Sequence, residues 1–162
     1  MTPRFPFVFA ALLTAATSAF ATDAAEGAAG QSVVEAWQAE PTRIFDGSEV
    51  DLDAFQWIAR PIVVFADTPA DPRFVEQIEL LMARLDELEE RDVVIITDTD
   101  PDASSDIRRQ LRPRGYMLAL IGKDGGVKQR KPSPWSVREL SRSIDKMPMR
   151  QQELREQALS GG

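Results

Sequence analysis

Residues 61–74, PIVVFADTPADPRF, contain the end of one element and the start of the next, and they decide the fold class. The run IVVFA at 62–66 is β-branched and aromatic without alternation, which predicts a strand covered on both faces. Asp71 and Pro72 are typical of a helix start, with Asp as the N-cap and Pro in the first helical position. The stretch therefore predicts an α/β protein in which a buried strand leads through a short loop into a helix.

Elements of the same kind follow along the chain. Apolar residues recur at helical spacing from Phe74 to Leu88, and DVVIITD at 92–98 predicts a second buried strand. Strand, helix and strand in this order form a right-handed unit with parallel strands. The remaining predicted elements are a short helix within 51–61 capped by Asp51 or Asp53, a helix at 104–111, a hairpin of strands at 116–122 and 127–131, and a helix from Ser136 to Met147 with capping-box spacing.

The order of the main elements is β-α-β-α-β-β-α. A parallel pair with a crossover helix, followed by an antiparallel hairpin and a closing helix, is the thioredoxin-like arrangement, with a central mixed sheet flanked by helices. We expect a signal peptide at 1–21, a flexible leader at 22–42, the thioredoxin-like domain at 43–148 and a polar helical tail at 149–162.

The first 21 residues have the features of an export signal. Arg4 precedes a mostly apolar run that ends at Ala16, and Ala19 and Ala21 match the small-residue pattern of a cleavage site. A membrane span needs about 20 apolar residues, and this run is shorter. We therefore expect cleavage between Ala21 and Thr22, a periplasmic or extracellular location, and no membrane insertion afterwards. N-terminal sequencing of exported protein checks this expectation.

The composition excludes several classes of chemistry. The chain has no Cys and no His, so thiol redox chemistry, Cys nucleophiles, Ser-His-Asp triads and the usual His/Cys zinc sites are impossible. A net charge of −7 argues against nucleic acid as the partner. Carboxylates, Lys, hydroxyls and Tyr116 remain for catalysis, and no cofactor is expected.

The loop after the first core strand is where thioredoxins carry their redox cysteines. Here it is ADTPADP, 66–72, and Thr68 and Asp71 fall about where the two cysteines would lie. For Asp71 the role of helix cap is favoured over a catalytic role. A polar cleft formed by Asp67, Thr68 and Asp71 would instead favour an enzyme.

An acidic segment, DTDPDASSD at 98–106, follows the second core strand. Asp98, Asp100 and Asp102 alternate as in the first half of a calcium loop. The EF-hand pattern requires Gly at its sixth position and Glu at its twelfth, where this chain has Ala103 and Arg109. A solvated acidic loop without a metal is therefore the favoured interpretation.

Charge is distributed unevenly along the chain. Residues 71–106 hold 12 acids and 3 bases, whereas residues 107–131 hold 8 bases and 1 acid. If 127–131 is a strand, Lys128 and Arg130 share one face. Two interpretations stay open: these cations protect a sheet edge against strand addition, or they dock an anionic partner together with Lys123 and Arg150.

Three stretches carry a resemblance to a known family: FQWIARPIVVFA at 55–66, LIGKDGGVKQR at 120–130 and SIDKMPMRQQE at 143–153. Over about residues 50–156 the chain resembles the domain of unknown function 4174 family. That family consists of small exported proteins expected to be thioredoxin-like, related to domains of animal extracellular-matrix proteins with sushi repeats. The resemblance implies the fold but no activity, cofactor or catalytic residue.

The favoured hypothesis is an exported, non-catalytic thioredoxin-like module that binds an unknown protein or an anionic envelope component. The alternatives are a cysteine-independent or degenerate oxidoreductase-like enzyme of the thioredoxin-like superfamily, and a structural component of the envelope.

Overall fold

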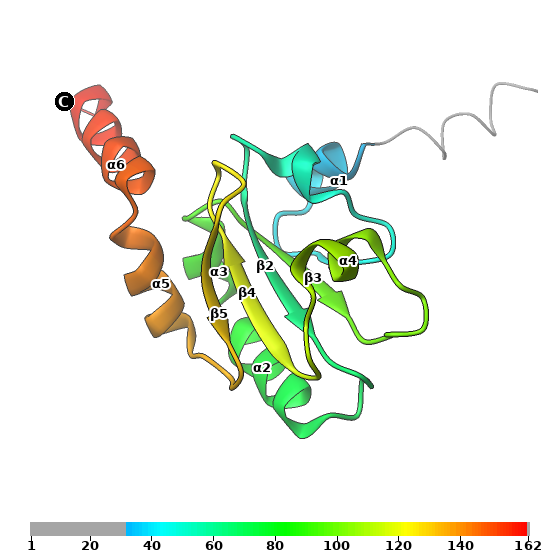
Figure 1. Cartoon of the computed structure of the whole chain (residues 1–162). Coiled ribbons are helices and arrows are strands. Elements are labelled where there is room, and N and C mark those ends of the chain that lie inside the picture. Colours follow the sequence, from blue (N-terminus) through cyan, green and yellow to red (C-terminus); the bar gives the residue numbers. More distant parts are fainter. Residues whose placement is uncertain (1–31, 162) are drawn as a thin grey trace, which may run out of the picture. The chain divides into compact units, whose positions relative to one another are not determined.

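Five strands form one mixed sheet in the computed structural model, which describes residues 32–161 (Figure 1). Their order across the sheet is β1-β3-β2-β4-β5. Strands β1 and β2 pair with β3 in parallel, whereas β4 runs antiparallel to both β2 and β5. The strands are β1 (Ile44–Asp46), β2 (Arg60–Phe65), β3 (Val93–Asp98), β4 (Met117–Ile121) and β5 (Val127–Lys131).

Helices cover both faces of this sheet. Figure 1 shows α2, α3 and α5 on one face, and α1 and α4 on the other. The helices are α1 (Val33–Ala39), the 3-10 helix η1 (Leu52–Phe55), α2 (Pro72–Met82), α3 (Leu85–Glu89), α4 (Asp106–Leu111), α5 (Val137–Asp145) and α6 (Pro148–Ser160). Among the described residues, no helix is both long and apolar enough to cross a membrane.

Strand β2 lies at the centre of the sheet and is buried along its whole length, as the run without alternation predicts. Ile62 and Val64 pack on the face of α2 and α5, whereas Val63 and Phe65 pack on the face of α1 and α4. The α/β class and the central strand are thereby confirmed.

The predicted helix after β2 starts where expected and ends early. Asp71 is the N-cap, and its side chain accepts a hydrogen bond from the backbone N–H of Arg73. The apolar stripe continues to Leu88, but the helix breaks after Met82 into α2 and α3. At Arg84 the chain leaves the helical conformation, with φ −147°, and its side chain pairs with Glu87 of α3.

The N-terminal boundary differs from the expected one. The prediction of a flexible leader over 22–42 is wrong for residues 32–42, because Ser32 and Glu35 form a capping box that starts α1. Trp37 is buried, and its indole N–H donates to the carbonyl of Val93 at 3.3 Å. The predicted signal peptide lies outside the described residues and stays a prediction.

Candidate functional site

The three polar residues of the loop at the redox position are each engaged separately. Asp71 caps α2 and pairs with Arg73 at 2.8 Å, and this hydrogen bond lowers the pKa of the Asp71 carboxyl. Thr68 Oγ1 accepts from the backbone N–H of Ala70, and Asp67 is largely exposed. Asp71 and Thr68 act as a cap and a turn residue, whereas Asp67 lies 3.9 Å from Arg108 Nη1, and the three side chains share no hydrogen-bond or ion-pair partner.

Behind this loop, a buried ion pair links the carboxyl ends of β2 and β3. The Arg108 guanidinium lies 2.8 Å from Asp98 Oδ1 and also donates to the carbonyl of Ala66 at 2.9 Å. Ser105 Oγ donates to the other oxygen of Asp98 at 2.5 Å. The prediction of a solvated acidic loop is therefore wrong for Asp98, whose side chain is only 4% exposed.

The rest of the acidic segment is a surface turn. Asp100 is exposed, and its carboxylate accepts hydrogen bonds from the backbone N–H groups of Asp102 and Ala103. These bonds organise the turn that leads into α4. No cluster of three potential metal ligands occurs within residues 32–161.

A second ion-pair network lies at the opposite end of β2 and contains two of the residues that the sequence suggested for partner binding. Glu153 of α6 accepts from Arg60 at 2.8 Å, from Lys123 at 2.9 Å and from Arg150 at 3.3 Å. Lys123 also pairs with Asp92 at 2.8 Å. The side chains of Lys123 and Arg150 are only 12% and 7% exposed, so they hold α6 on the domain and do not present a docking surface.

The pKa of Glu153 is lowered although its carboxyl is partly buried. Desolvation alone would raise the pKa of its carboxyl, but the hydrogen bonds from Arg60 and Lys123 outweigh that effect and lower it. The charged form is therefore the one that the folded protein stabilises.

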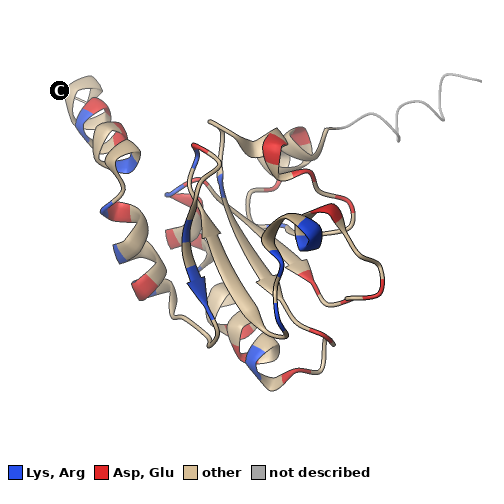
Figure 2. Cartoon of the chain, in the orientation of Figure 1, with Lys and Arg blue, Asp and Glu red and all other residues tan. Residues whose placement is uncertain are grey.

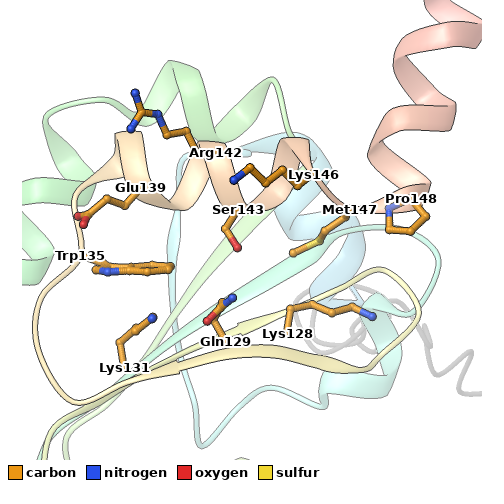
Figure 3. A pocket seen from close by; sticks show the side chains of 10 residues that line it. All are labelled: Lys128, Gln129, Lys131, Trp135, Glu139, Arg142, Ser143, Lys146, Met147 and Pro148. Carbon is orange, nitrogen blue, oxygen red and sulfur yellow. The ribbon is translucent and has the colours of Figure 1, made fainter.

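The two remaining docking candidates lie on β5 and are separated by a β-bulge. Leu120 of β4 pairs with Gln129, but Ile121 pairs with Val127, so Lys128 is an extra residue in the strand. The expectation that Lys128 and Arg130 share a face is wrong for this reason. Lys128 lies with Gln129 on the side of α5 and pairs with Asp124 at 2.5 Å (Figure 3).

The bulged face of β5 forms one wall of an open groove, which we call the β5–α5 groove. Its volume is about 610 Å³, and Figure 3 shows Gln129, Trp135, Ser143 and Met147 between β5 and α5, with the Arg142 side chain directed away from β5 at the rim. The lining residues are Lys128, Gln129, Lys131, Trp135, Glu139, Arg142, Ser143, Lys146, Met147 and Pro148.

The groove carries an excess of positive charge. Within the described part of the chain, Lys131, Arg142 and Lys146 have no acidic side chain within ion-pair distance. Figure 2 shows the basic positions along β5. The one acid of the groove, Glu139, is hydrogen-bonded to the backbone N–H and hydroxyl of Ser136, which lowers the pKa of its carboxyl.

Trp135 is the aromatic member of the groove, and a buried amide holds the loop that presents it. Gln77 of α2 is fully buried; it accepts from the Trp135 N–H at 2.8 Å and donates to the Trp135 carbonyl at 2.9 Å. The Tyr116 hydroxyl donates to the same Gln77 oxygen at 3.1 Å. The Lys131 ammonium lies 4.1 Å from the centroid of the Trp135 ring, which leaves a cation and an aromatic surface side by side.

The sequence interpretation missed Trp135, Arg142 and Lys146. The available signal was the spacing of Arg142 and Lys146, which lie four residues apart and therefore on one face of the predicted helix. Nothing in the sequence showed that this face meets β5.

Comparisons with known proteins agree with this fold. The model of a family described as "Domain of unknown function (DUF4174)" matches residues 51–153, and no curated protein matches the sequence. The crystal structure of a reduced 2-Cys peroxiredoxin from Plasmodium vivax is similar, with a TM-score of 0.53 and 16% identity; the match covers 65% of this chain and 90% of the peroxiredoxin. The solution structure of reduced desulfothioredoxin from Desulfovibrio vulgaris Hildenborough matches with a TM-score of 0.47 and 19% identity, over 64% of this chain and 96% of that protein. At 16% identity the likeness to the peroxiredoxin shows the fold alone, and that fold agrees with the predicted thioredoxin-like arrangement.

Proposed function

Because this chain belongs to the DUF4174 family, whose description assigns no activity, we propose a function from its own surface: it is an exported, non-catalytic thioredoxin-like module that binds an anionic partner in the β5–α5 groove. The partner is an acidic protein segment or an anionic polymer of the cell envelope. Export rests on the N-terminal signal pattern of residues 1–21.

The observation that carries this proposal is the contrast between the groove and the whole chain. The protein has a net charge of −7, yet Lys131, Arg142 and Lys146 gather in one groove without acidic partners among the described residues. Cations held close together repel one another, and an anionic ligand removes that repulsion while it gains attraction. Trp135 adds an apolar surface on which part of the ligand can pack.

The enzyme alternative has weaker support. It requires Asp67, Thr68 and Asp71 to act together at the redox position, but Asp71 and Thr68 are engaged in caps and turns. The Asp98–Arg108 pair, with its members 4% and 11% exposed, lies buried behind that loop. A structural envelope component without a ligand would leave the cations of the groove unexplained.

The charge-reversal variant R142E/K146E tests the proposal. We expect wild-type protein at low salt to be retained on immobilised poly-glutamate despite its negative net charge, and the double variant to pass unretained, because like charges now face the polymer. Retention should weaken as salt approaches about 0.15 M, where the screening length is about 8 Å. The measurement is the salt concentration at which each protein elutes.

Arg155→Glu is the single-site control, because Arg155 is an exposed cation of α6 that lines neither this groove nor any other described pocket. It should elute close to the wild type. Equal elution of the wild type and R142E/K146E would disprove the groove as the docking site.

A further inference from the structure

A second cavity lies at the end of β5, beside Arg130 and Lys131, and its charged lining residues are all basic among the residues that the structure describes. It has a volume of about 310 Å³, and we call it the arginine pocket. Four cations line it, Arg112, Arg114, Arg130 and Lys131, beside Tyr116 and Met117. Within residues 32–161, no acidic side chain lines the pocket.

We propose that the arginine pocket binds a phosphate or sulfate group, at a site distinct from the β5–α5 groove, with which it shares only Lys131. None of its four cations has an acidic side chain within ion-pair distance in the part of the chain that the structure describes. The Lys131 ammonium lies on Trp135, but Arg112, Arg114 and Arg130 still place three like charges around one cavity, where they repel each other, in a chain with 26 acids. An oxyanion with several acceptor oxygens is the ligand that relieves this arrangement.

The backbone that carries two of these arginines is held in an unfavourable conformation. Arg112 ends α4 with φ 50° and ψ 57°, a left-handed conformation that is normally taken by Gly at helix ends. Pro113 and Gly115, the latter with φ 63°, frame Arg114 in the same turn. An arginine kept where glycine is more stable points to a role for its side chain, and that side chain lines the pocket.

A third arginine is positioned from β5. Arg130 donates through Nη1 to the carbonyl of Leu111, the last residue of α4, and that nitrogen lies 3.8 Å from Met117 Sδ. One nitrogen of the guanidinium is thus used to fix the side chain. Its Nε and Nη2 make no hydrogen bond with the described residues and remain available to a ligand.

The chemistry of the lining selects the ligand class. Guanidinium groups present paired N–H donors that match the oxygens of phosphate and sulfate, and an anion with several oxygens can accept from more than one arginine at once. A cavity of 310 Å³ lies at the lower end of the range for small-molecule sites. Tyr116, Met117 and Pro132 give it an apolar wall, which suits the organic part of an ester.

Isothermal titration of the folded protein at 0.15 M salt tests the site, with inorganic pyrophosphate, phenyl phosphate and phenyl sulfate as probes. We expect at least one probe to bind with a Kd below about 1 mM. The variant R112Q/R114Q should bind it at least about ten-fold more weakly, because two charge-assisted donors are lost. Arg155→Gln, which removes one exposed cation elsewhere, should bind as the wild type does.

A second variant separates binding from folding. Arg112→Gly should raise the melting temperature, since glycine accepts the left-handed conformation without strain. The same variant should still bind the probe more weakly than the wild type does. Binding of pyrophosphate alone identifies a free ion as the ligand, and binding of the esters identifies a phosphate or sulfate group on a larger molecule. Absence of binding for all three probes, or equal binding by R112Q/R114Q, would overturn the proposal.

The outcome is distinguishable from that of the proposed function. The groove variant R142E/K146E should keep the probe affinity of the wild type, because Arg142 and Lys146 do not line the arginine pocket. The variant R112Q/R114Q should in turn keep most of the retention on poly-glutamate. Loss of both properties in either variant would contradict two independent sites.

Discussion

Replacing Glu153 by Ala is expected to lower the free energy of unfolding by about 3 kcal/mol. This carboxylate is the shared acceptor of Arg60, Lys123 and Arg150, and the Arg60 side chain is only 1% exposed. Without Glu153, these buried positive charges lose the carboxylate that they share. The ion pairs that attach α6 to the rest of the domain are lost as well. Urea unfolding followed by circular dichroism measures the change.

The matched control is Glu156→Ala, an exposed acid one turn further along α6. It should leave the unfolding free energy unchanged within the error of the measurement, because exposed surface substitutions have small effects. A similar loss in both variants would mean that the helix itself, and not the ion network, is responsible.

The pH dependence gives an independent measurement of the same network. The folded-state pKa of Glu153 lies below its ordinary value of 4.5, so the folded state favours the charged carboxylate. Its contribution to stability is complete above pH 4.5 and is lost as the pH falls through the folded-state pKa. Between neutral pH and about pH 3, wild-type protein should therefore lose more stability than Glu153→Gln, and a parallel decline of both would contradict the role of this group.

Local signals sufficed for the elements that lie at the centre of the fold. The run at 62–66 predicts a buried strand by itself, because its apolar side chains occupy both faces. The Asp71-Pro72 pair predicts a helix start by itself, because Asp71 supplies the cap. Strand β1 was not predictable in this way, because it has three residues and only Phe45 is buried. Its strand conformation comes from pairing with β3, which lies about 50 residues later in the chain.

The arginine pocket was predictable as a region and not as residues, whereas Trp135, Arg142 and Lys146 of the β5–α5 groove lie outside that region. The charge count placed the basic surface at 107–131, and Arg112, Arg114, Arg130 and Lys131 all belong to that range. A cation is available to a ligand only if no acidic side chain of the protein already pairs with it. Lys123 pairs with Glu153, which lies 30 positions later in the sequence, and this contact is not visible in the local sequence. The bulge at Lys128 and the support of Trp135 by Gln77 are likewise products of tertiary contacts.

Replacing Arg108 by Ala is expected to lower the free energy of unfolding by about 4 kcal/mol. Asp98 is 4% exposed, and after the substitution its charge would have Ser105 as the remaining side-chain partner. The carbonyls of Ala66 and Asp98, which Arg108 Nη2 reaches at 2.9 and 3.0 Å, would lose a donor as well. Breaking a buried pair by removing one member is costly because the other member stays charged and desolvated.

The neighbouring residue Arg109 provides the control for Arg108→Ala, and a double variant tests whether Arg108 and Asp98 are coupled. Arg109 is 65% exposed and pairs with the exposed Asp106, so Arg109→Ala should have no measurable effect on unfolding. If Arg108 acts through Asp98, the variant D98A/R108A should be less destabilised than the sum of its single substitutions, because it leaves no unpaired charge behind. Strict additivity would show that the two side chains are not coupled.

If the Asp98–Arg108 pair has a structural role only, the folded Arg108→Ala protein should still elute from poly-glutamate at the wild-type salt concentration, since Arg108 does not line the β5–α5 groove.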